Sequence, residues 1–163
     1  MLVTKQAPDF KAQAVMPDNT FKEISLSDYK GKKVVLFFYP LDFTFVWPSE
    51  LLAFHNRLDQ FEERNTQVLG CSVDSHFSHL RWKEMDVNSG GIGKVGYPLI
   101  SDLDKSIGRS YDVLLGTSSA MRRNHRGSLR GWGKWINTQC STRSWLCTTG
   151  WCCYWSNCTG NNH

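Results

Sequence analysis

Apolar runs and amphipathic segments alternate along the first 115 residues of the chain. Residues 33–39, "KVVLFFY", form a continuous β-branched and aromatic run, which predicts a strand buried on both faces and stopped by Pro40. The next apolar positions are spaced i, i+3, i+7 and i+10, so they predict one helix that begins between Thr44 and Pro48. These positions are Leu51, Phe54, Leu58 and Phe61. Pro48 fits the first turn of this helix, where a missing N–H costs no hydrogen bond.

A second strand and helix follow. Residues 66–74, "TQVLGCSVD", predict another buried strand. Ser75 can cap a short helix that ends at Met85. In this helix we expect Phe77 and Leu80 to face inward.

A third unit completes the pattern. The glycine-rich loop of residues 88–96 leads to a strand around residues 97–101, and Asp102 then caps a helix. Its apolar positions are Leu103, Ile107 and Tyr111. The order strand, helix, strand, helix predicts an α/β sheet with helices on its faces. Ligand chemistry in such sheets is found at the carboxyl ends of the strands, which is where residues 40–47 lie.

Composition divides the chain in two. Residues 1–116 carry 15 acidic and 13 basic side chains, whereas residues 117–163 carry six basic and no acidic ones. The second segment also holds five of the six cysteines and five of the seven tryptophans. The longest apolar run, residues 34–41, is far shorter than the roughly 20 residues that span a bilayer. The first ten residues lack the layout of a signal peptide, so we expect a soluble, cytoplasmic protein.

Five short segments resemble one protein family. They are "APDF" (7–10), "VVLFFYPLDFTFVWPSE" (34–50), "VLGCSVDS" (68–75), "GGIG" (90–93) and "YPLISD" (97–102). In this order they resemble the typical two-cysteine peroxiredoxins, above all the alkyl hydroperoxide reductase and thioredoxin peroxidase group. The resemblance covers residues 3–122 and implies a thioredoxin-like fold of the peroxiredoxin type, incomplete at its C-terminal end. It also implies thiol-dependent reduction of hydrogen peroxide and alkyl hydroperoxides without a metal or organic cofactor.

The family's site is Pro-x-x-x-Thr-x-x-Cys together with a distant Arg. On this chain the resemblance assigns those positions to Pro40, Thr44, Trp47 and Arg122. It implies that the proline shields a thiolate, the threonine hydrogen-bonds the peroxide and the arginine lowers the cysteine pKa. A helix N-terminus also favours a thiolate. Attack on the peroxide gives a sulfenic acid, which a second cysteine resolves as a disulfide.

Trp47 stands where the family has its peroxidatic cysteine. Indole Nε1–H is only a donor, so no thiolate chemistry can begin there. Indole is also much larger than a thiol, and overpacking typically costs ~1–3 kcal/mol. Cys71 lies on a predicted buried strand, where cysteine behaves as an inert apolar residue. We therefore expect the chain as written to be inactive.

Other chemistry is less favoured by the sequence. His76 and His79 have a spacing that could suit a metal, but without neighbouring ligands we expect both to be exposed. "GGIG" does not follow a strand into a helix, so it is not expected to bind phosphate. The family's resolving Cys-Pro-x-Gly-Trp is similar to "CTTGW", which makes Cys147 a weak candidate for the resolving cysteine. A zinc site in the tail and binding of nucleic acid are both disfavoured, because paired cysteine knuckles and a regular basic pattern are missing.

We divide the chain into a peroxiredoxin domain, residues 1–122, and an aberrant Cys-, Trp- and Arg-rich tail, residues 123–163. The family's next segment is a β-hairpin beside the strand of residues 33–39, and the tail lacks the alternating apolar pattern for it. We interpret the tail as out-of-frame translation without an ordered fold. Without this hairpin, we expect the strand of residues 33–39 to have an open edge that is prone to aggregation.

The resemblance also implies partners. They are a peroxide substrate, a thioredoxin-like or flavoprotein reductant, and further copies of the chain in a homodimer or decamer. No membrane partner is expected. The alternative from another class is a non-catalytic, oligomeric holdase, since family members can hold clients without the thiol. A third is a metal-binding cysteine cluster in the tail.

Overall fold

The computed structural model describes residues 6–44 and 48–114, together with the backbone of residues 153–157. The described strands form one mixed sheet in the order β2-β1-β5-β4-β3-β6. β3 and β4 are parallel, as are β4 and β5, whereas β1 runs antiparallel to both β2 and β5. The strands are β1 Lys11–Val15, β2 Phe21–Ser25, β3 Lys33–Phe38, β4 Thr66–Ser72, β5 Leu99–Ser101 and β6 Cys153–Asn157.

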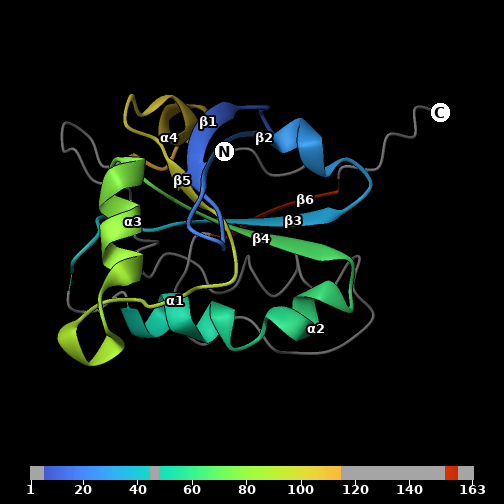
Figure 1. Cartoon of the computed structure of the whole chain (residues 1–163). Helices are drawn as coiled ribbons and strands as arrows, with labels where there is room; N and C mark the ends of the chain where they lie inside the picture. The colour runs from blue at the N-terminus through green and yellow to red at the C-terminus, as the bar shows by residue number, and fades with distance from the viewer. Residues whose placement is uncertain (1–5, 45–47, 115–152, 158–163) are drawn as a thin grey trace, which may run out of the picture.

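Helices lie on both faces of this sheet (Figure 1). α1 and α2 run along one face, and α4 lies on the other. The described helices are α1 Pro48–His55, α2 Leu58–Glu62, α3 His76–Glu84 and α4 Ser106–Ser110, with short 3-10 turns at Leu26–Tyr29 and Val87–Ser89. This arrangement is the thioredoxin-like α/β fold that the sequence predicted.

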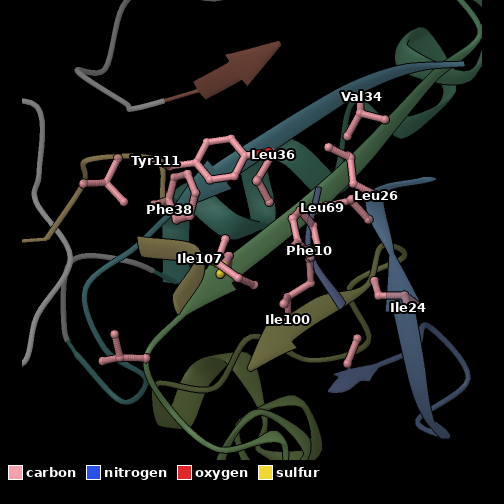
Figure 2. Packing of buried hydrophobic residues seen from close by; sticks show 14 residues of the cluster. Phe10, Ile24, Leu26, Val34, Leu36, Phe38, Leu69, Ile100, Ile107 and Tyr111 are labelled. Atoms are coloured by element: carbon pink, nitrogen blue, oxygen red, sulfur yellow. The ribbon is translucent and has the colours of Figure 1, made fainter. Parts of the chain in front are cut away.

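β3 contributes to both halves of the core because its side chains alternate between the two faces. Val34, Leu36 and Phe38 join the cluster that α4 covers, and Figure 2 shows them packed with residues such as Leu69 and Ile107. Val35 and Phe37 point to the opposite cluster, which α1, α2 and α3 cover. All five side chains are buried, so the prediction of a strand buried on both faces is confirmed.

The prediction of a single helix over residues 48–61 is wrong in one respect. The chain forms two helices, because the backbone leaves helical geometry at Arg57, with φ −118° and ψ 12°. The Arg57 N–H bonds to the Phe54 carbonyl, three residues back, which tightens and ends α1. Leu51, Phe54 and Phe61 are nevertheless buried, so the apolar stripe survives the break. The prediction that Pro48 lies in the first turn is confirmed.

The inward face of α3 differs from the prediction. Ser75 caps the helix as expected, since its hydroxyl accepts from the Ser78 N–H. Phe77, however, is 64% exposed, and Leu80 is only half-buried. The buried residues are His79, Trp82 and Lys83, so the stripe is offset and the expectation of an exposed His79 is wrong.

α4 is shorter than predicted. It begins at Ser106, and Leu103 precedes it with 65% of its surface exposed. Asp102 does cap the helix, from four residues before its start. Its carboxylate accepts from the N–H groups of Ile107 and Gly108 at 3.0 and 2.7 Å.

The predicted open edge of β3 is occupied. β6 pairs antiparallel with β3, with Cys153 opposite Phe37 and Asn157 opposite Lys33. The prediction of an unpaired edge is therefore wrong, because five residues of the tail supply main-chain partners without an alternating apolar pattern. The rest of residues 123–163, and the boundary at residue 122, lie outside the described residues. No helix in the described part is long and apolar enough to cross a membrane.

The two ends of the described domain are joined. β1 lies between β2 and β5, so the N-terminal hairpin completes a sheet whose other strands come later in the chain. Tyr111 packs edge-on against Phe10, and its hydroxyl donates to the Pro8 carbonyl at 2.8 Å. The domain therefore closes through contacts about a hundred residues apart in sequence.

Candidate functional site

The candidate site begins where β3 ends. The Tyr39 N–H donates to the Cys71 carbonyl, which extends the pairing with β4 by one residue. Pro40 follows, half-buried, and opens the turn of residues 40–44 at the carboxyl ends of two parallel strands. Thr44 ends this turn, and its hydroxyl donates to the Leu41 carbonyl at 2.9 Å.

Only part of the predicted site lies within the described residues. Pro40 and Thr44 occupy one short turn, and three residues separate Thr44 from Pro48, where α1 begins. Trp47, Arg122 and Cys147 lie outside the described residues, so their roles stay predictions.

The buried pair of Asp42 and His79 holds the turn of residues 40–44 in place. Asp42 lies within the turn, and its Oδ2 is 2.7 Å from Nδ1 of His79 on α3, with both side chains almost fully buried. The Tyr39 hydroxyl donates to the other carboxylate oxygen at 3.0 Å. Tyr39, Asp42 and His79 therefore tie β3, the turn and α3 into one network.

Both ring nitrogens of His79 face hydrogen-bond acceptors. Nδ1 lies 2.7 Å from Asp42 Oδ2, and Nε2 lies 3.2 Å from the Ile100 carbonyl. The pKa of Tyr39 is raised well above its usual range, first by burial and then by the Asp42 carboxylate, so its hydroxyl remains a donor.

A second carboxylate holds the backbone of the turn. Oδ2 of Asp74, just beyond β4, accepts from the Asp42 N–H at 2.9 Å and from the Ser72 hydroxyl at 2.8 Å. The Ser101 hydroxyl donates to the Asp74 carbonyl, which links this corner to the end of β5. The turn is therefore anchored to the ends of three neighbouring strands.

Phe43 has strained backbone geometry in this turn. Its φ is +58°, in the left-handed region that non-glycine residues rarely adopt, at a cost of roughly 1–2 kcal/mol. The ring is about half exposed and packs 5.9 Å from the Trp82 ring. The surrounding anchors impose this conformation, since nothing in a phenylalanine side chain favours it.

Cys71 has the environment predicted for it. The side chain is fully buried on β4, and burial raises the pKa of its thiol well above the usual value, with the Asp102 carboxylate adding to the shift. A thiol in this state is neither a nucleophile nor a metal ligand. In residues 6–44 and 48–114, no three His, Cys, Asp or Glu side chains come together as a metal site.

Sequence reasoning missed Asp42 and Asp74 and wrongly expected His79 to be exposed. Two signals were available. Asp42 follows one predicted buried strand and Asp74 ends the next, and parallel strands bring such residues to one edge of the sheet. His79 is four residues after the Ser75 cap and three before Trp82, which is the spacing of an inward stripe.

Comparison with known proteins identifies the family. The model of the AhpC/TSA family matches residues 3–127. The mitochondrial thioredoxin-dependent peroxide reductase of Drosophila melanogaster is 59% identical over 113 residues, which cover 69% of this chain and 48% of that protein.

Solved structures agree with this. A Plasmodium yoelii Prx1a, modified at its N-terminus and described as an artifactual octamer, is 60% identical with a TM-score of 0.70, over 73% of this chain and 69% of that one. The mitochondrial 2-Cys peroxiredoxin of Plasmodium falciparum is 36% identical with a TM-score of 0.69, over 83% of this chain and 90% of that one. The chain spans about half the length of the curated relatives it matches. It belongs to the AhpC/TSA family, and its relatives there are the 2-Cys peroxiredoxins.

Proposed function

We propose that this chain is a thiol-peroxidase scaffold without its nucleophile. The observation that carries the proposal is the anchored turn of residues 40–44, which delivers the chain to the N-terminus of α1. Position 47 immediately precedes that N-terminus and holds tryptophan. The names of the relatives support thioredoxin-dependent peroxide reduction as the ancestral activity.

The N-terminus of α1 would favour the thiolate form of a cysteine at position 47. The positive end of the α1 dipole would stabilise its thiolate. Attack on a peroxide would form an S–O bond while the O–O bond breaks. The sulfur would be oxidised to a sulfenic acid, and the other oxygen would leave as water or an alcohol after taking a proton. A second thiol would then condense with the sulfenic acid and release water.

The chain as it stands cannot carry out this step. Indole offers no electron pair of thiolate reactivity, and Cys71 is buried with a raised pKa. The expected result is therefore no peroxide consumption with thioredoxin, thioredoxin reductase and NADPH, or with a flavoprotein disulfide reductase.

Trp47→Cys tests the proposal directly. After addition of hydrogen peroxide, we expect one equivalent of sulfenic acid, trapped by dimedone at position 47. We expect little sustained turnover, because Cys147 in "CTTGW" only partly matches the family's resolving Cys-Pro-x-Gly-Trp. Trp47→Ser is the matched control, and adding Cys71→Ser to Trp47→Cys should change nothing. Turnover by the unmodified chain, or labelling at Cys71 in place of position 47, would contradict the proposal.

Self-association with a client-holding role is the second candidate function. Phe21 of β2 and Phe77 of α3 are exposed and meet edge-to-face, with ring centroids 5.3 Å apart. His76 packs against both rings. Exposed apolar clusters of this kind favour an interface, and the octamer named for the Plasmodium yoelii relative supports an assembly of further copies, such as a dimer or decamer.

Light scattering and a client-aggregation assay separate this role from catalysis. Phe77→Ser should lower the oligomer mass and weaken suppression of client aggregation. Val87→Ser, at an exposed apolar residue outside the cluster, is the matched control. A chain that is monomeric at all concentrations would exclude this second role.

A further inference from the structure

The end of α1 is bonded to the glycine-rich loop through a histidine. The Gly96 N–H donates to Nδ1 of His55, the last residue of α1, at 3.1 Å. A backbone N–H can only donate, so Nδ1 must carry its lone pair and the ring proton must be on Nε2. The contact therefore requires the neutral imidazole in one tautomer.

The contact depends on close approach of the loop backbone. A Cβ on Gly96 would lie 3.3 Å from Nδ1 of His55 and 2.6 Å from Cδ1 of Leu58. A larger residue at position 96 would require the Leu58 side chain or the loop to shift at the junction between α1 and α2. The absence of a side chain lets one hydrogen bond join the helix end to the loop.

The same loop is attached to α3 at its other end. The Trp82 indole N–H donates to the Gly90 carbonyl at 2.9 Å, and the Ile92 N–H donates to the Trp82 carbonyl. Beyond Gly96, the Tyr97 hydroxyl donates to the Leu51 carbonyl within α1. The loop thus bridges α1, which leads from the candidate site, and α3, which holds the turn through His79.

Protonation of His55 is incompatible with this contact. A proton on Nδ1 would place two donors face to face, and the Gly96 N–H would lose its acceptor. The carbonyl groups at the end of α1 favour a cation, and the His55 side chain is half-buried. The charged side chains on the adjoining segments, Arg57, Asp59 and Lys94, are all exposed. Histidine is the side chain whose charge changes between about pH 5 and 8.

We infer that His55 is a pH-sensitive latch between α1 and the loop of residues 90–96. The latch is closed when the ring is neutral and opens on acidification, which releases the Gly96 backbone from His55 while the Tyr97 bond to α1 and the Trp82 bonds to α3 remain. The mobility of the loop and of the α1 end then depends on proton concentration, whether or not position 47 carries a reactive group. This inference is independent of the proposed function.

Hydrogen exchange on the full chain tests the latch. After correction for intrinsic rates, protection of the Gly96 amide should fall by about tenfold or more between pH 7.5 and 5.5. Amides of β3 and β4 should keep their protection. His55→Asn places an amide oxygen near Nδ1 at every pH, so it should remove the pH response. His76→Asn is the matched control and should retain it.

Two outcomes would overturn the inference. One is a Gly96 amide whose protection is independent of pH in the unmodified chain. The other is a tautomer with the proton on Nδ1, read from the imidazole nitrogen shifts at pH 7.5, which needs no variant. A mostly Nε2–H tautomer together with acid-induced loss of protection would support it.

Discussion

Removing one partner of the buried pair beneath the turn should cost much of the domain's stability. In His79→Leu, the carboxylate of Asp42 stays about 1% exposed and keeps only the Tyr39 hydroxyl as a side-chain donor. An uncompensated buried charge of this kind typically costs about 3–5 kcal/mol. A small domain is stable by about 5–15 kcal/mol, so the loss should be large but measurable.

A double-mutant cycle with Asp42→Asn separates the pair from its surroundings. Asp42→Asn removes the charge and should therefore lessen the damage of His79→Leu. We expect the double variant to be more stable than the sum of the single effects by about 2 kcal/mol or more. Urea unfolding at pH 7, followed by far-UV circular dichroism, gives each free energy of unfolding.

The exposed pair Lys11–Glu23 is the matched control. Its atoms are 2.7 Å apart, as in the buried pair, but both side chains are largely exposed to water. Lys11→Met and Glu23→Gln should therefore be additive within error, because solvent screens the interaction. Equal coupling in the two cycles would refute the argument that burial makes the Asp42–His79 pair important.

Three further predictions follow from burial and from the sheet edge. Iodoacetamide at pH 8 should label Cys71 only after denaturation, whereas labelling of the folded chain at the rate of a free thiol would contradict its raised pKa. Burial lowers the pKa of Lys83 from 10.5 to about 8, so the unfolded chain binds more protons between those two values. The free energy of unfolding should therefore rise with pH across that window relative to Lys83→Met; urea melts that run parallel would exclude this. Deleting residues 153–163 removes the partner of β3, and sedimentation should then detect new association of the chain. Introducing charged residues at this edge of β3 should suppress that association. An unchanged mass would refute a protective role for β6.

The sequence predicts β3, β4 and β5 because their signals are local, but it predicts neither the β1–β2 hairpin nor β6. The continuous apolar run of residues 33–39 has a single reasonable interpretation, and the structure confirms it. Ser75 and Asp102 act as helix caps because capping depends on a few neighbouring N–H groups. These features need no knowledge of the rest of the fold.

The errors concern choices that the tertiary structure makes. Phe77 and His79 compete for the inward face of α3, and hydrophobicity alone favours Phe77. The structure buries His79 because Asp42 and the Ile100 carbonyl offer it partners, and those lie 37 and 21 residues away. Similarly, the edge of β3 is closed by a strand whose contribution is its backbone, which side-chain patterns do not report.

The position of β1 has a consequence for synthesis of the chain. The β1–β2 hairpin leaves the ribosome before β5, the strand that pairs with the inner edge of β1, which is translated about 75 residues later. Until then β1 lacks the β5 strand beside which Ala14 and Val15 lie in the finished sheet. The sheet around β1 and the Tyr111–Pro8 contact can therefore be completed only after β5 and Tyr111 have been synthesised.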